Sequence, residues 1–139
     1  MYLMDVLLDA SAIMAVILNE PSREEVISLT ENAILLSPEI ISHEIGNALI
    51  NLFKRRKIIE AELMEAYKKF LVIPIRSIKV DVEKALRIAI KYNICAYDSY
   101  YLEIATRLKT PLISFDISMK KIALDLNINI LSTMIGKRI

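Results

Sequence analysis

Four carboxylate side chains stand where an acid is costly unless a positive group meets it. Asp9 and Asp116 each end an apolar run, and Glu44 and Asp98 interrupt the apolar faces of two expected helices. Carboxylates that converge raise one another's pKa or recruit a cation. Clustered oxygen ligands suit Mg²⁺ or Mn²⁺. The residue types therefore indicate metal-dependent chemistry on phosphates.

Short apolar runs alternate with helical patterns along the chain, which predicts a parallel sheet covered by helices on both faces. The expected strands are 6–8, 34–36, 72–75, 112–115 and 128–131. The expected helices are 12–19, 22–32, 38–54, 60–71, 82–90, 98–108 and 117–126.

Local signals refine three of these elements. Ser22 and Glu25 have the spacing of a capping box for the second helix. Ser37 and Pro38 are expected to supply the N-cap and first position of the third helix. Pro74 lacks a backbone N–H, so it indicates that the strand around it lies at a sheet edge.

The expected architecture gives the acids a common location. Asp9 and Asp116 follow strands, and ligands of open α/β sheets bind beyond the carboxyl ends of strands. Glu44 shares a helical stripe with Ile41, and Asp98 lies on the apolar side of its own helix. A buried carboxylate without a partner costs several kcal/mol, roughly. We therefore expect a cation, a proton or a hydrogen-bond donor at each acid.

Structural interpretations compete with a site role. Asp9 and Asp116 could cap the helices that follow them, and Asp98 could stabilise its own helix through the helix dipole. Glu44 could form a buried ion pair with Arg76 or Lys79. What favours a site is the set of four, in the order strand end, helix, helix, strand end.

Composition limits the other possibilities. The 139 residues are expected to form a single domain over 1–139. With 55% hydrophobic residues and a mean hydropathy of +0.42, the chain has a large core or a buried protein interface. The net charge of +1 gives no global field for nucleic acid, so any basic footprint is local. Of the basic groups, Lys120-Lys121 is the best placed for RNA, because it follows Asp116 by about one helical turn.

The expected location is the cytoplasm. Cys95 is the one cysteine, so no intrachain disulfide forms, and it is expected to be a core residue in a reducing compartment. The longest apolar run, 12–18, is too short to span a bilayer. Asp5 and Asp9 break the apolar stretch that a signal peptide would need.

Four segments around the acids resemble the acidic motifs of the PIN domain, the nuclease fold of VapC-type toxins. In the first, Ser11 follows Asp9 by two residues, and in the second, Asn47 follows Glu44 by three. The third surrounds Asp98 and is the most specific. The segments are 7–12, 44–49, 97–105 and 112–116, with Ser114 where the family often has Thr.

The resemblance implies a three-layer α/β sandwich with a five-stranded parallel sheet of order 3-2-1-4-5. It also implies an Mg²⁺- or Mn²⁺-dependent ribonuclease, the toxin of a toxin–antitoxin pair, which hydrolyses RNA by attack of water and leaves a 5′-phosphate. By carry-over, Ser11 would orient a carboxylate or a metal-bound water, and Asn47 would support the site. The metal ligands would be Asp9, Glu44, Asp98 and Asp116. A homodimer and an antitoxin protein are the implied partners, besides RNA.

Other classes fit the residues less well. A haloacid-dehalogenase phosphatase needs an Asp where Ser11 stands, and a receiver domain needs paired acids after its first strand. No glycine-rich phosphate loop occurs, and a Ser-His-Asp hydrolase would have to use His43, the one histidine. We expect His43 to lie at the surface or an interface. The alternative to an enzyme is a catalytically silent PIN-like module that binds RNA or protein.

Overall fold

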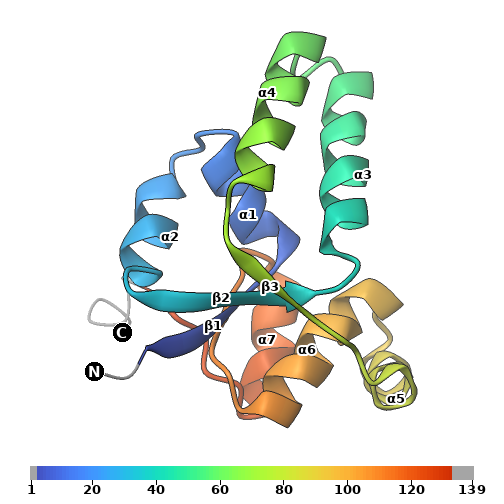
Figure 1. The fold of residues 1–139 in the computed structure, drawn as a ribbon. Coiled ribbons are helices and arrows are strands. Elements are labelled where there is room, and N and C mark those ends of the chain that lie inside the picture. Colours follow the sequence, from blue (N-terminus) through green and yellow to red (C-terminus); the bar gives the residue numbers. More distant parts are fainter. Residues whose placement is uncertain (1–2, 133–139) are drawn as a thin grey trace.

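A parallel sheet forms the middle layer of the molecule (Figure 1). The computed structural model describes residues 3–132, and within them the sheet has four strands in the order β3-β2-β1-β4. All three strand pairings are parallel. The strands are β1 (Met4–Leu8), β2 (Ala33–Pro38), β3 (Ile75–Ile78) and β4 (Leu112–Ile113).

Helices cover the sheet on both sides (Figure 1). Helices α1 to α4 lie on one side, where α3 and α4 stand side by side, and α5 to α7 lie on the other. On the first side the bounds are α1 (Ala10–Ile17), α2 (Arg23–Leu29), α3 (Ile41–Lys54) and α4 (Glu60–Leu71). On the second side they are α5 (Val82–Tyr92), α6 (Ala96–Leu108) and α7 (Ile117–Asp125).

The central strand and two helices contribute many of the most deeply buried core residues. Strand β1 buries three successive residues from Val6 to Leu8, as expected for a strand covered on both faces. Helix α1 contributes Ile13 and Ile17, and α6 contributes Leu102 and Ile104, all at most 2% exposed. Burial of each such side chain stabilises the fold by about 1.5–3 kcal/mol before entropy is counted. The elements that carry Asp9 and Asp98 are therefore among the most rigidly packed.

Strand register places two acidic segments next to each other. Leu8 pairs with Ile113 across β1 and β4. The backbone N–H of Asp9 continues this ladder by donating to the carbonyl of Ile113, 3.3 Å away. Asp9 thus leaves the sheet beside Ser114, at the carboxyl edge where the sequence predicts a site.

The predicted fold class is confirmed, with a small difference at one edge. The segment expected as the fifth strand pairs with β4 through a single parallel bridge between Leu112 and Ile130. Leu112 donates to Asn129 at 2.9 Å and accepts from Leu131 at 3.0 Å. The segment lies where the order 3-2-1-4-5 requires. It does not extend further because its partner β4 has only two residues.

Strand β3 starts three residues later than expected. It spans Ile75–Ile78, while Val72 is 79% exposed and follows α4. Pro74 therefore precedes the strand, and its missing N–H removes no ladder bond. The predicted edge position is confirmed, because β3 has β2 as its one neighbour in the described sheet.

One expected helix start is wrong, and a second expected cap lacks its side-chain bond. Ser37 and Pro38 belong to β2, where the Ser37 hydroxyl donates to the carbonyl of Leu8 at 2.7 Å, and α3 begins at Ile41. Ser22 is at the N-cap position of α2, as expected, but its side chain makes no capping bond. Sheet pairing in the first case outweighs the local preference of a Ser-Pro pair for a helix start.

No helix among residues 3–132 has the length and apolar character to cross a membrane.

Candidate active site

Asp9 is a buried acid that also caps a helix. It is 4% exposed, and its Oδ1 accepts hydrogen bonds from the Ala12 N–H at 3.0 Å and from the Ser11 hydroxyl at 2.6 Å. The capping interpretation is therefore correct for Asp9. Burial raises the pKa of its carboxyl group, and hydrogen bonds from Ser11, Ser114 and Ala12 oppose that rise. The negative charge of Asp116 raises the pKa further.

Ser11 connects the start of α1 to the loop after β4. Its hydroxyl donates to Asp9 and accepts from the Phe115 N–H at 2.9 Å. The loop residue Ser114 is buried and accepts from the Asp116 N–H at 3.1 Å. Two serines thus fix the segment that carries Asp116 relative to the Asp9 carboxylate.

Glu44 meets a hydroxyl group and not a cation. The Tyr101 hydroxyl of α6 donates to Glu44 Oε1 at 2.7 Å, which joins the two helices that carry acids. No ion pair involves Glu44 among residues 3–132, so the proposed pairing with Arg76 or Lys79 is wrong. Burial raises the pKa of Glu44, the Tyr101 bond lowers it, and the charges of Asp98 and Asp9 raise it again.

Asp98 lies in the first turn of α6, where the helix dipole favours an acid. Burial raises the pKa of its carboxyl group, a hydrogen bond with the Cys95 side chain lowers it, and the Asp116 charge raises it. The helix starts at Ala96, two residues earlier than expected. Cys95 is exposed at the N-cap position, so the expectation of a core cysteine is wrong.

Asp116 is the fourth acid of the group and lies at its solvent-exposed side. It is exposed, it caps α7, and its Oδ1 accepts from the Met119 N–H at 2.9 Å. Its charge acts on both Asp9 and Asp98, and these two in turn act on Glu44. The four acids that the sequence singled out therefore form one electrostatically connected group.

The donor chemistry of this group suits a hard divalent cation, because all four side chains offer carboxylate oxygens. Within residues 3–132, no three His, Cys, Asp or Glu side chains form a ready-made metal-binding cluster. Mutual repulsion disfavours a tight cluster as long as no cation lies between the carboxylates. The residues thus fit a metal by type, charge and shared location, and not by closed coordination geometry.

Asn47 lies one turn beyond Glu44, and among residues 3–132 no hydrogen bond joins its side chain to the four carboxylates. It is exposed and lines a surface cavity of about 540 Å³ together with Glu44, His43 and Tyr97. The exposure of His43 agrees with its expected surface position. The cavity extends from the acidic group along the exposed side of α3.

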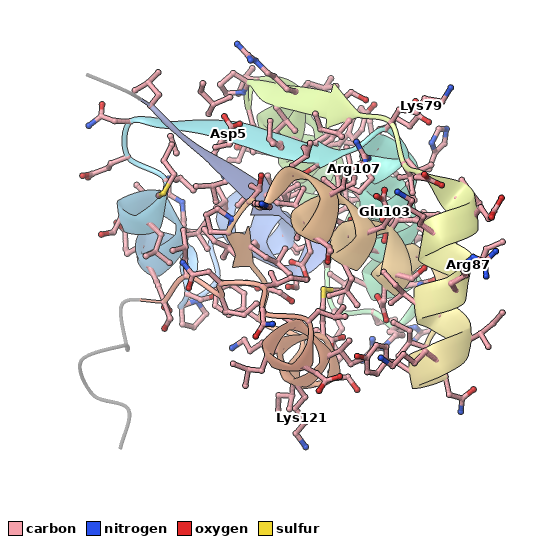
Figure 2. All side chains as sticks on the ribbon, turned by 90° about the horizontal axis from the view of Figure 1, so that it is seen from below. Asp5, Lys79, Arg87, Glu103, Arg107 and Lys121 are labelled. Carbon is pink, nitrogen blue, oxygen red and sulfur yellow. The ribbon has the colours of Figure 1, made fainter. Side chains whose placement is uncertain are left out.

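Near Asp116, the basic residues Lys120 and Lys121 lie in different environments. Lys120 Nζ lies 5.7 Å from the centre of the Phe115 ring, which holds it close to the loop that carries Asp116. Lys121 is exposed and points away from the body of the molecule on α7 (Figure 2). Of the two, Lys120 is better placed for a phosphate near the acids.

Two polar features of α6 escaped the sequence reasoning. Tyr101 is 1% exposed, and the contact of its hydroxyl with Glu44 was not foreseen. Glu103 is 2% exposed and pairs with Arg107 at 2.7 Å. The four-residue spacing of Glu103 and Arg107 is a recognisable signal for such a pair.

The class of this fold is defined by its parallel sheet, its strand order and the acids at the carboxyl edge. A model of the PIN domain matches residues 6–124, and the chain belongs to the PIN-domain family. The predicted resemblance is thereby confirmed.

Three solved structures share the fold. PAE2754 from Pyrobaculum aerophilum is 21% identical, with a TM-score of 0.65 over 91% of this chain and 98% of that one. The sarcin-ricin loop cleaving toxin VapC20 of Mycobacterium tuberculosis is 11% identical, with a TM-score of 0.62 over 84% and 94%. VapBC2 from Rickettsia felis, bound to a promoter DNA fragment, is 14% identical, with a TM-score of 0.61 over 92% and 98%. No curated protein sequence matches the chain.

Proposed function

We propose that the protein is an Mg²⁺- or Mn²⁺-dependent endoribonuclease that hydrolyses phosphodiester bonds by attack of water. One observation supports this most directly. Four carboxylates act on one another at one edge of the sheet, and no ion pair joins any of them to a Lys or Arg in the described chain. Acids held together without a cation of the protein's own leave room for an external one.

The proposed metal ligands are Asp9, Glu44, Asp98 and Asp116. A bound divalent ion would neutralise charge on the phosphate and lower the pKa of water to near neutrality. The protein's own groups position the acids. Ser11 holds Asp9, and the buried Tyr101 hydroxyl holds Glu44.

Asn47 supports the site from the next turn of α3. Lys120, next to the Asp116 loop, is available to a substrate phosphate.

The biological role we propose is the toxin of a type II toxin–antitoxin pair. Support comes from the family and from the shared fold of VapC20 and of the VapBC2 complex. In that role the chain would form a homodimer as a single PIN domain over residues 1–139, with an antitoxin protein as its partner. A reducing cytoplasm suits a chain with one cysteine, Cys95.

Cleavage of a labelled RNA pool with Mn²⁺, or with EDTA in its place, tests the proposed activity. We expect cleavage with Mn²⁺ alone, and a loss of at least about 100-fold in Glu44→Gln, because an amide supplies no charge for the ion. Glu65→Gln is the matched control, since Glu65 is exposed on α4 outside the acidic group.

Equal cleavage by Glu44→Gln and the wild type would contradict the proposed role of Glu44. A wild type that neither cuts RNA nor binds Mn²⁺ would leave a catalytically silent PIN-like binding module.

A further inference from the structure

The cavity beside Glu44 is lined by polar and aromatic side chains that do not belong to the group of four acids. Its volume of about 540 Å³ lies within the range of small-ligand sites. One wall comes from successive turns of α3, and the first turn of α6 supplies an aromatic ring. The polar and aromatic residues of the lining are His43, Glu44, Asn47, Asn51 and Tyr97.

The polar side chains of this wall have unused hydrogen-bonding capacity. In the described part of the chain, the side chains of His43, Asn47 and Asn51 make no hydrogen bond to protein. Asn47 and Asn51 are four residues apart, so their amides lie one above the other on the same face of α3. Each amide offers donors and an acceptor to whatever enters the cavity.

Tyr97 presents an aromatic ring at the same cavity. It is 55% exposed, so much of the ring is accessible to a ligand in the cavity. The Tyr100 ring meets it edge-on, with 5.8 Å between ring centres and 88° between the planes. This contact restrains the Tyr97 ring and leaves it partly open to solvent.

The charge of the cavity argues against a phosphate as its occupant. No Lys or Arg is among its lining residues in the described chain, and Glu44 is the acid at its edge. A phosphate would be repelled there, whereas a neutral, flat group with polar edges would meet both the ring and the free amides.

We propose that this cavity binds a nucleobase of a single-stranded RNA, stacked on Tyr97 and hydrogen-bonded by Asn47 and Asn51. Base stacking on aromatic rings, together with edge contacts to amides, is the general chemistry of single-strand recognition. The inference rests on the proposed nuclease function and adds a substrate class to it. A base held beside Glu44 brings the phosphates next to it toward the four acids.

Nucleosides test the base site without metal or cleavage. Adenosine, guanosine, cytidine and uridine would be titrated in EDTA into the isotope-labelled full chain, and amide shifts and saturation transfer to base protons would be recorded by NMR. We expect at least one nucleoside to bind, and Tyr97→Leu to weaken its binding by about tenfold. Tyr97→Phe retains the ring and should bind as the wild type does.

Two further variants separate stacking from general damage. Tyr100→Leu removes the same ring contact from the other side but keeps the cavity ring, so it should bind within about threefold of the wild type. Asn51→Ala is expected to reduce the preference among the four nucleosides, because a base-reading amide is lost. An unchanged preference would remove Asn51 from the proposal.

The outcomes for the base site and for the nuclease are distinguishable. Nucleoside binding that depends on Tyr97, in a protein that cuts no RNA with Mn²⁺, would support the base site and contradict the nuclease. A protein that cuts RNA but binds no nucleoside, with the same KM in Tyr97→Leu, would overturn the base site alone. Binding that is equal in Tyr97→Leu would also overturn it, and would leave the cavity to another class of ligand, such as a protein segment.

Discussion

Asp9 caps a helix and is also one of the proposed metal ligands. The Ala12 N–H and the Ser11 hydroxyl share its Oδ1, so the carboxylate is fixed by the helix that it caps. Asp116 caps α7 in the same way and is also a proposed ligand. Capping and metal binding are thus compatible, since a cap uses part of the capacity of a carboxylate to accept bonds. A capping signal in the sequence therefore does not argue against a site role.

Ser11 is the residue where loss of a single hydroxyl should be most visible. In Ser11→Ala, the Phe115 N–H loses its acceptor and Asp9 loses its shortest hydrogen bond. We expect the free energy of unfolding to fall by about 1–3 kcal/mol, measured by urea denaturation. Ser11→Thr keeps the hydroxyl and should recover most of the loss. Ser42→Ala, at an exposed position of α3, should change stability by at most about 0.5 kcal/mol.

The raised carboxyl pKa values predict an unusual pH dependence. Asp9, Glu44 and Asp98 have pKa values raised first by burial and then by neighbouring acids. Between the unfolded pKa of about 4 and the raised folded values, the folded protein retains protons that the unfolded chain has released. The contribution of these three carboxyl groups to the free energy of unfolding is therefore full below that pH range. It falls as the pH rises through the range.

Urea denaturation in EDTA at a series of pH values measures this effect. The decline should be shallower in Asp98→Asn, because one of the titrating groups is gone. Identical pH profiles for the variant and the wild type would contradict the link between titration of Asp98 and the free energy of unfolding. Added Mn²⁺ should oppose the decline, since metal binding requires deprotonated carboxylates.

At the scale of elements, two ion pairs of equal spacing differ in burial. Glu103 on α6 is buried and accepts from Arg107 and from the Asp81 N–H at 2.8 Å. Arg107 also donates to the carbonyl of Lys79 at 2.7 Å. These bonds tie the segment before α5 to α6. The pair formed by Arg87 with Glu83, within α5, is exposed on both sides.

Removing the arginine from each pair separates the effect of burial from that of spacing. Arg107→Met leaves the Glu103 carboxylate buried without its cation. We expect a loss of about 3 kcal/mol, at the low end for buried pairs because Arg107 is partly exposed. Arg87→Met should cost at most about 0.5 kcal/mol. Thermal or urea unfolding measures both, and equal losses would contradict a structural role for the buried pair.

Periodicity predicted most elements, and the failures have local causes. The run from Leu71 to Ile73 is apolar and resembles a strand, but it ends α4 and leads into β3. Strand β3 lies at the sheet edge and contains Arg76 and Ser77, which are both exposed. Its sequence therefore lacks the apolar run that predicts a buried strand. The end of β2 shows the opposite failure. There a local helix-start signal is overridden by the pairing of Ser37 and Pro38 with β3.

At the scale of the whole molecule, the strand order brings the acids together. Asp9 and Asp116 are far apart in sequence, and register between β1 and β4 makes their segments neighbours. Sequence spacing indicated which acids belong to the group, because each disrupts an apolar pattern. It could not indicate the contact between Glu44 and Tyr101, which depends on the packing of α3 near α6. The shared edge of the sheet was predictable, and the side-chain partners were not.

Calorimetric titration of Mn²⁺ into the wild type and Asp98→Asn, with cleavage of a labelled RNA pool in parallel, tests the central claim most directly. Asp5→Asn is the matched control, since Asp5 is an exposed acid outside the group. We predict that the wild type and Asp5→Asn bind Mn²⁺ and cut RNA. Asp98→Asn should lose both activities while it keeps its fold by circular dichroism. A folded wild type that binds no Mn²⁺ would contradict the account, and would leave the four acids as helix caps and hydrogen-bond acceptors.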